Sequence, residues 1–324
     1  MSKYIFSLRD LHFYSVVESI CSLISSGTEL KIFKGLFDEA PLDVNIKGMA
    51  ESNMAYPLTY GYSLVGRVRR CGTNVADADN ILGKLVFTFS CHSSRVVADR
   101  DSIHLVPPGI APEDAMFFPS VETALAIVHN ANVRVGENVA VFGQGLIGLF
   151  VTYILCTTAC SSFQGSHRFG TVTVFDEIPD RLAMASVMGA SEALLPIAAG
   201  KAGPFDVSIE VSGNDRALQS AIDNTSNGGR VIIASWYGNT SVSLKLGIEF
   251  HRSHMTLIAS QVSEIPANLR MTWTKARRFA LTWKILQKIK PSKHLLTKTV
   301  GIQDAQIAYE LLDAGKEIAV SFKY

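Results

Sequence analysis

A short glycine-rich stretch constrains the fold of this chain more than any other feature. It follows four apolar residues, 139–142 (VAVF), and opens a second apolar stretch that reaches about residue 160. When a buried strand turns through glycines into a helix, the main-chain N–H groups of the turn bind the pyrophosphate of a dinucleotide. The first glycine allows the bend, the second the close approach of the phosphate, and the third the packing of the helix on the strand. The predicted cofactor-binding residues of this turn are Gly143, Gln144, Gly145, Leu146, Ile147 and Gly148.

The second sign of a dinucleotide site is an acidic residue at the end of the next strand. Asp176 follows the β-branched run 171–175 (TVTVF). A carboxylate at this place accepts hydrogen bonds from the ribose hydroxyls and repels a 2′-phosphate, so it favours NAD over NADP. Asp176 lies 28 residues after Gly148, whereas the usual spacing is ~20, and we assign the excess to a polar surface insertion at 161–170. The alternative is that Asp176 is an ordinary surface residue.

Strand and helix patterns alternate from residue 138 to residue 261, which predicts a doubly wound parallel sheet. The predicted strands are 138–142, 171–175, 206–211, 230–235 and 255–261, and the predicted helices between them include 179–188 and 215–225. Ligands of such sheets bind outside the carboxyl ends of the strands. Two further loops therefore belong to the predicted cofactor site, although the two aromatic residues also suit plain packing between domains. Their residues are Ser212, Gly213, Ser235, Trp236 and Tyr237.

The composition fits a two-domain globular protein of 324 residues, with 48% apolar and 18% charged residues. Residues 1–110 hold short apolar runs separated by Gly, Pro and Asn, which predicts a β-rich domain that ends near the breaker 107–109 (PPG). The net charge of +1 gives no basic excess for nucleic acid. We therefore expect a small-molecule substrate and no nucleic-acid partner.

One segment resembles a membrane span, because residues 138–167 contain no Asp, Glu, Lys or Arg. A buried parallel strand followed by a buried helix has the same hydropathy, and the glycine turn favours that interpretation over a membrane protein. The five cysteines are scattered and form no CxxC pair, which argues against a disulfide framework. A reducing compartment fits best, so we expect a cytoplasmic protein.

Several motifs together resemble the medium-chain dehydrogenase/reductase superfamily, the relatives of alcohol dehydrogenase. They are 26–29 (SGTE), 61–63 (GYS), 83–87 (GKLVF), 106–109 (VPPG), 122–124 (ETA) and the closing segment 302–324. The resemblance implies a GroES-like catalytic domain formed by 1–110 and 291–324, and a Rossmann domain formed by 111–290. It also implies NAD as the cofactor, with NADP as the second choice, and we expect a homodimer.

The departures from this family concern its metal. Zinc-dependent members bind the catalytic ion through Cys and His, but Ser26 and Tyr62 stand at these two positions. Neither side chain suits zinc, which prefers thiolate, imidazole or carboxylate ligands. The four-cysteine structural zinc lobe is also missing, and the adjacent pair Cys91 and His92 cannot complete a tetrahedron alone. The segments 236–238 (WYG), 246–253 (LGIEFHRS) and 260–262 (SQV) resemble a zinc-free branch of the family, so we expect no metal.

Three residues are candidates for catalysis without zinc. Thr28 matches the family's relay hydroxyl, Tyr62 lies at the position of a metal ligand, and Glu122 opens a predicted helix. In other interpretations Thr28 caps a turn, Tyr62 fills volume and Glu122 stabilises the helix N-terminus. The main hypothesis is hydride transfer between NAD(H) and an alcohol or carbonyl. The alternatives are an NADPH-dependent reductase of an activated double bond, such as an enone or enoyl thioester, and a dinucleotide-binding protein that has lost its activity.

Overall fold

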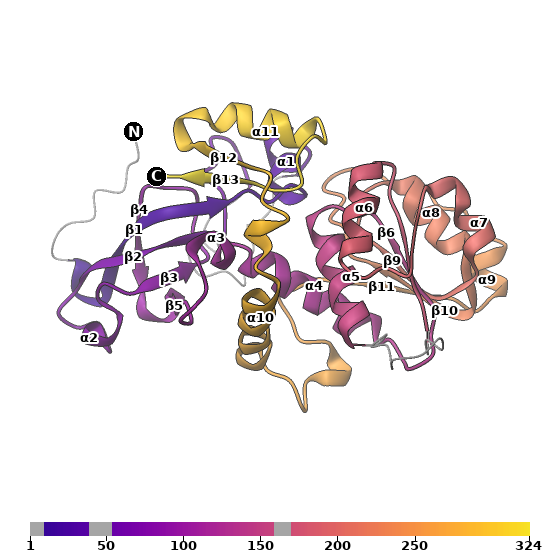
Figure 1. Cartoon of the computed structure of the whole chain (residues 1–324), viewed down its shortest axis with the longest axis horizontal. Helices are drawn as coiled ribbons and strands as arrows, with labels where there is room; N and C mark the ends of the chain where they lie inside the picture. The colour runs from indigo at the N-terminus through magenta and orange to yellow at the C-terminus, as the bar shows by residue number, and fades with distance from the viewer. Residues whose placement is uncertain (1–9, 39–53, 159–169) are drawn as a thin grey trace. The chain divides into compact units, whose positions relative to one another are not determined.

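The computed structural model describes residues 10–38, 54–158 and 170–324 (Figure 1). The chain forms two compact units. Unit 1 comprises Met1–Pro119 and Trp283–Tyr324, and unit 2 comprises Ser120–Thr282. Both divisions fall inside the segment 111–290 that the sequence analysis gave to the Rossmann domain. Aromatic packing explains this difference, because the rings of Phe118 and Trp283 lie 4.5 Å apart, next to Phe87 of the unit 1 sheet.

Unit 2 contains a six-stranded sheet in which every pair of neighbouring strands is parallel, which confirms the predicted doubly wound sheet. The neighbouring apolar strands Val139–Phe142 and Val172–Phe175 are buried along their whole length, as expected for a sheet covered on both faces. The strand order is β11-β10-β9-β6-β7-β8. The strands are β6 (Val139–Phe142), β7 (Val172–Phe175), β8 (Glu192–Leu194), β9 (Phe205–Glu210), β10 (Thr225–Ile233) and β11 (Thr256–Ala259).

Helices lie on the two sides of these strands, with α5 and α6 on one side and α7, α8 and α9 on the other (Figure 1). Leu218, Ala221 and Ile222 of α8 pack into an apolar core with Ala140 and Phe142 of β6. The helices are α5 (Leu146–Thr158), α6 (Pro179–Val187), α7 (Ala199–Ala202), α8 (Asp215–Asp223) and α9 (Glu249–Arg252). No helix in the described ranges is both long and apolar enough to span a membrane.

One local prediction was wrong. The sequence 227–229 (NGG), just after the helix predicted at 215–225, is typical of a turn that ends a helix, but these residues lie within β10. The register between β10 and β9 shifts between Thr225 and Arg230, and Gly228 has a φ of +72°. The glycine pair thus forms an irregularity inside a strand, which is the other common position for glycine in a sheet.

Unit 1 contains a seven-stranded mixed sheet, which confirms the β-rich first domain. The last strand returns to the first one, with Cys21 opposite Lys323 in an antiparallel pair. The strands are β1 (Tyr14–Leu23), β2 (Leu64–Cys71), β3 (Leu85–Thr88), β4 (Arg95–Asp99), β5 (His104–Leu105), β12 (Lys298–Gly301) and β13 (Val320–Lys323). Two helices of this unit matter below: α1 (Thr28–Phe33) and α11 (Ala305–Asp313).

Candidate functional site

The candidate cofactor site lies at the carboxyl edge of the parallel sheet in unit 2. The chain runs from β6 outward through β7 to β8, and from β9 outward in the opposite direction through β10 to β11. The two neighbouring strands β6 and β9 therefore form the topological switch point, where open α/β sheets bind their ligands. The glycine turn follows β6 at this point, and the loops at Ser212 and Ser235 follow β9 and β10.

The glycines of the turn have different surroundings. A Cβ added to Gly148 would lie 2.0 Å from the carbonyl oxygen of Gly143, so only glycine allows this close packing of helix and turn. Gly143 has a φ of +101°, and a Cβ there would lie 2.8 Å from Ser212 Cα. At Gly145, by contrast, a Cβ would meet no atom within 4 Å. The open space lies where a pyrophosphate needs to approach the main chain, so these residues fit a dinucleotide.

The first turn of α5 offers main-chain donors of the kind that such an anion needs. The helix begins at Leu146 and directly follows Gly145. Its first amides, including those of Leu146, Ile147 and Gly148, have no partner within the helix because no carbonyl precedes them at the required distance. The partial positive charge of the helix N-terminus adds to their attraction for phosphate.

Gln144 and Asp176 hold the turn together. The Gln144 side chain is fully buried, where its Nε2 donates to the Gly143 carbonyl at 2.9 Å and its Oε1 accepts from Thr152 at 3.0 Å. Its main-chain N–H donates to Asp176 Oδ2 at 2.6 Å, and the N–H of Ile178 donates to Oδ1 at 2.9 Å. Asp176 thus lies beside the glycine turn. Its carboxylate has lone pairs left for ribose hydroxyls, and this role stays a prediction. The predicted insertion 161–170 lies almost wholly outside the described residues.

Glu210 is the residue of this site that the sequence analysis missed. It ends β9 and is fully buried. Its Oε1 accepts from the Ser212 N–H at 2.7 Å, the Gly213 N–H at 2.8 Å, and the hydroxyls of Ser212 and Ser235 at 2.9 and 3.1 Å. Its Oε2 accepts from the Tyr237 hydroxyl at 2.9 Å. Burial, together with the Glu210 charge, raises the pKa of Tyr237. One carboxylate thus fixes the two predicted cofactor-site loops, while Trp236, between Ser235 and Tyr237 in the second loop, is 41% exposed.

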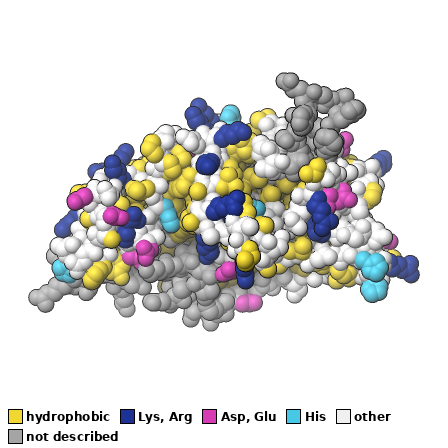
Figure 2. Space-filling model, turned by 90° about the horizontal axis from the view of Figure 1, so that it is seen from below, with side chains coloured by type: hydrophobic (Ala, Val, Ile, Leu, Met, Phe, Trp, Pro, Cys, Tyr) yellow, Lys and Arg dark blue, Asp and Glu magenta, His cyan; other side chains and the backbone are white. Residues whose placement is uncertain are grey.

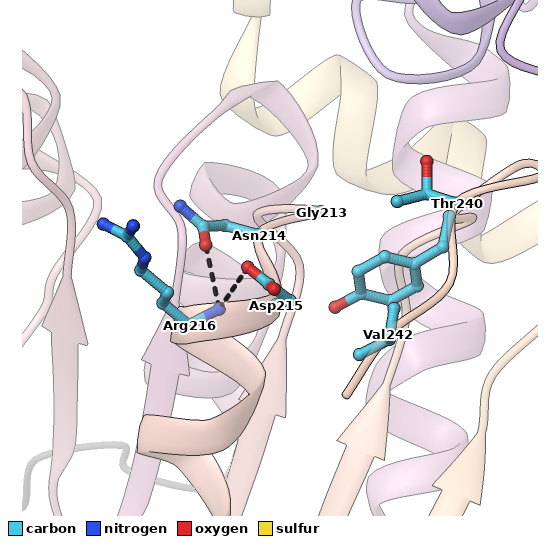
Figure 3. Close-up of a pocket in the computed structure, with 7 residues that line it drawn as sticks. Gly213, Asn214, Asp215, Arg216, Thr240 and Val242 are labelled. Carbon is cyan, nitrogen blue, oxygen red and sulfur yellow. Dashed lines mark hydrogen bonds between the residues drawn. The ribbon is translucent and has the colours of Figure 1, made fainter. Parts of the chain in front are cut away.

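A cavity of about 440 Å³ borders these loops (Figure 3). The side chains of Asn214 and Asp215 both accept a hydrogen bond from the main-chain N–H of Arg216, at 2.9 and 2.8 Å. The first turn of α8 is therefore capped by the protein itself, and this N–H group is not available to an anion. The residues that line the cavity are Gly213, Asn214, Asp215, Arg216, Tyr237, Thr240 and Val242.

Unit 1 contains a buried network of side chains around Glu29 and His92. Glu29 is 2% exposed, and its carboxylate accepts from the Tyr309 hydroxyl at 2.7 Å and bonds His92 Nε2 at 2.9 Å. The other ring nitrogen of His92 lies 2.7 Å from the Ser22 hydroxyl, which lies 2.8 Å from the Tyr324 hydroxyl. Burial and the Glu29 charge raise the pKa of Tyr309. The network links β1, α1, α11 and the last residue of the chain.

The candidate hydroxyls Thr28 and Tyr62 lie next to this network. Thr28 is the first residue of α1 and precedes Glu29. Tyr62 follows Gly61, where an added Cβ would lie 2.8 Å from the His92 ring. Both candidate side chains are half-buried, and Tyr62 packs against an apolar cluster that includes Ile32. The structure thus places both segments next to the buried pair Glu29 and His92. The catalytic roles of Thr28 and Tyr62 stay predictions.

Glu122 has a partner inside unit 2. It is buried on α4 (Phe118–Ala131), and its Oε1 accepts from Arg278 Nε at 3.0 Å and from Arg278 Nη2 at 2.6 Å. The buried guanidinium also donates to the carbonyls of Val262 and Glu264. This geometry gives Glu122 a structural role in joining α4 to α10 (Lys275–Ile289). Catalysis by Glu122 stays a prediction.

The described residues contain no group of three or more His, Cys, Asp or Glu that could hold a metal ion. Cys91 and His92 both have other partners, since the Cys91 thiol lies 3.5 Å from the Thr59 carbonyl and His92 bonds Glu29.

Lys and Arg side chains on the face shown in Figure 2 are dispersed among apolar and uncharged ones.

The comparisons with known proteins agree with this architecture. No family model matches the chain. D-guloside 3-dehydrogenase of Escherichia coli (strain K12) is 28% identical over 241 residues, which cover 70% of this chain and 65% of that protein. A zinc-type alcohol dehydrogenase-like protein of the same organism, YphC, is 25% identical over 243 residues, which cover 71% and 63%. The chain thus spans less than two thirds of the length of these relatives.

Solved structures show the same fold. An alcohol dehydrogenase of E. coli CFT073, solved with the cofactor NADH, superposes with a TM-score of 0.72 at 17% identity. The superposition covers 96% of this chain and 92% of that one. In sequence the chain is thus similar to a sugar dehydrogenase and a zinc-type alcohol dehydrogenase-like protein, and in fold to an alcohol dehydrogenase. The matches do not show the zinc-free branch expected from the sequence, because one relative is itself named a zinc-type protein.

Proposed function

We propose that this chain is an oxidoreductase that transfers a hydride between NAD(H) and an alcohol or carbonyl substrate. The observation that carries the proposal is the open main-chain surface at Gly145, placed at the N-terminus of α5 and at the switch point of the sheet. The matching curated relatives are dehydrogenases. The nicotinamide ring supplies the hydride chemistry when the cofactor is bound.

In this proposal the residues of unit 2 bind and orient the cofactor. The first amides of α5 bind the pyrophosphate, and Asp176 accepts hydrogen bonds from the ribose hydroxyls. The same carboxylate repels a 2′-phosphate, which favours NAD over NADP. The loops fixed by Glu210 lie over β9 and β10, on the other side of the switch point, and there they orient the nicotinamide half.

We further propose that the chemistry needs no zinc. Ser26 and Tyr62 occupy the positions of two metal ligands, and neither is a suitable donor for zinc. Thr28 and Tyr62 then polarise the substrate oxygen through their hydroxyls. In alcohol oxidation the bound cofactor would take the hydride from the substrate carbon. The substrate hydroxyl would pass its proton to one of these hydroxyls, which would release its own proton to the next acceptor or to water. We also propose that the protein is a cytoplasmic homodimer. Sedimentation of the purified protein tests its oligomeric state.

Cofactor titration tests the first part of the proposal. Protein fluorescence is titrated with NADH and with NADPH, and we expect tighter binding of NADH. Asp176→Ser should shift the preference toward NADPH by about tenfold. Asp180→Ser is the matched control, because Asp180 is exposed on the next helix. Tighter binding of NADPH by the wild type would favour the double-bond reductase instead.

Turnover with a panel of alcohols, carbonyls and enones tests the second part. Tyr62→Phe should lower kcat about a hundredfold at unchanged NADH affinity. Tyr60→Phe is the control for packing, because the Tyr60 ring meets the Tyr62 ring edge-on with their centroids 6.0 Å apart. One stoichiometric zinc ion in the purified protein would refute the zinc-free chemistry. Tight cofactor binding without any turnover would identify a dinucleotide-binding protein.

A further inference from the structure

Glu210 lies directly beside the glycine turn. In the register of the sheet it pairs with Phe142, the last residue of β6, on one side and with Ile233 of β10 on the other. Gly143 follows Phe142, and a Cβ at Gly143 would lie 2.8 Å from Ser212, whose N–H and hydroxyl both bind Glu210. The carboxylate is therefore at the switch point, where the nicotinamide half leaves the phosphate turn.

Hydrogen-bond donors surround the Glu210 carboxyl group. Five neutral donor groups point to its two oxygens, four to Oε1 and one to Oε2. A carboxylate can only accept hydrogen bonds, so a set made up of donors alone suits the ionised group.

This charge has no cationic partner in the described part of the chain. All five donors are neutral, and no ion pair there includes Glu210. A buried carboxylate is normally paired with a cation. Among the other buried acids, Glu122 pairs with Arg278 and Glu29 bonds His92, whereas Asp114 and Asp176, like Glu210, have no ion pair within the described residues. Neutral donors alone therefore balance the Glu210 carboxylate, at the sheet edge where the proposed cofactor would bring a positive charge. The nicotinamide ring is positively charged in NAD⁺ and neutral in NADH.

We propose that Glu210 positions the two nicotinamide-side loops and that its buried negative charge favours the oxidised over the reduced cofactor. The inference rests on the proposed function, because it needs a nicotinamide dinucleotide at this edge. Glu210 acts through the loops and through its field, so it is a positioning residue rather than a catalytic one. It needs no contact with the reacting atoms.

The test compares Glu210→Gln, which removes the charge at nearly constant shape, with Glu210→Asp, which keeps the charge but withdraws it by one methylene group. Dissociation constants for NAD⁺ and NADH are measured by isothermal titration calorimetry on the full chain. Both variants should bind both forms more weakly, because the loops lose hydrogen bonds. Only Glu210→Gln should also change the ratio of the two constants, by about fivefold against NAD⁺, a typical Coulomb effect across a protein interior.

If Glu210→Gln fails to fold, variants of two residues that donate hydrogen bonds to Glu210 provide a second test. Ser235→Ala and Tyr237→Phe each remove one donor and keep the charge, so they should weaken NAD⁺ and NADH by equal factors. A Glu210→Gln protein with an unchanged ratio, or an altered ratio in Ser235→Ala, would overturn the inference. A wild type that binds neither form would instead refute the proposed function itself.

Discussion

The carboxyl edge of the sheet in unit 2 and the Glu29–His92 network in unit 1 both gather polar groups, but from different sources. At the sheet edge the groups are mostly main-chain amides, which residues close together in one turn, such as Gly143 and Gly145, bring together. In the network they are side chains from four distant segments, and the Glu29–Tyr309 bond spans 280 residues. The first region is built by local backbone geometry, and the second by the completed fold.

The glycine turn gives the largest expected effect and tests whether backbone geometry alone builds the first region. Gly148→Ala should destabilise unit 2 by about 3 kcal/mol, because its Cβ would lie 2.0 Å from a main-chain carbonyl that cannot swing aside. Gly145→Ala should change stability by less than about 0.5 kcal/mol, because nothing surrounds its Cβ. Urea unfolding followed by circular dichroism measures both values.

Cofactor binding separates these two glycines further. Gly145→Ala should weaken NADH binding at least about tenfold, since a methyl group would stand where the pyrophosphate approaches. If Gly145→Ala binds NADH as tightly as the wild type does, the open surface at Gly145 is not the phosphate site. Equal stability losses in the two variants would contradict the difference in their surroundings.

The network in unit 1 should respond to the loss of a single charge. Glu29→Gln keeps the shape but places an amide among three donors: the Ser25 N–H, the Tyr309 hydroxyl and His92. One buried donor then lacks an acceptor, so we expect a loss of about 2 kcal/mol in unfolding free energy. Glu310→Gln, in an exposed residue next to Tyr309, is the matched control.

Two further measurements decide whether this effect belongs to the network. A double-mutant cycle with Tyr309→Phe should give a coupling energy of about 1 kcal/mol, because the two groups share one hydrogen bond. NADH affinity should not change, since all network residues belong to unit 1. Additive effects in the cycle would show that Glu29 and Tyr309 stabilise the fold independently.

The same contrast explains what the sequence could predict. The parallel sheet and the turn at Gly143 were predictable because a strand, three spaced glycines and a helix are contiguous signals. Glu210 was missed because an acid at the end of an apolar strand usually faces solvent. Its position before Ser212 and Gly213, at the edge that binds ligands, was the available signal.

The network had no comparable signal. His92 was assessed only together with its neighbour Cys91, because sequence spacing reveals metal sites better than it reveals buried pairs. The partners of His92 lie 63 and 70 residues earlier in the chain, at Glu29 and Ser22. Glu122 illustrates the same difficulty, since its partner Arg278 is 156 residues away. Only the folded chain shows which acids are paired.

A change at His129 gives the smallest expected effect on stability. It tests whether unit 2 also contains a buried ionisable group whose surroundings the sequence does not reveal. Its ring lies 4.3 Å from the Trp273 ring, and its buried Nδ1 has no hydrogen-bond partner in the described structure. Burial, followed by the charges of Arg278 and Arg277, lowers its pKa to about 4. Above pH ~6.5 the residue is neutral in the folded and unfolded states, so it adds no pH dependence there.

Below that pH the unfolded chain binds a proton at His129 before the folded chain does. Stability should therefore fall as the pH drops from about 6.5 toward 4, by about 1 kcal/mol once solvent screening of the partly exposed ring is included. His129→Phe keeps an aromatic ring beside Trp273 but cannot titrate, so its unfolding free energy should fall less over this range. His251→Phe, at an exposed position in the same unit, should keep the pH dependence of the wild type. Parallel curves for wild type and His129→Phe would mean that the imidazole is protonated equally in both states, and that water reaches its Nδ1.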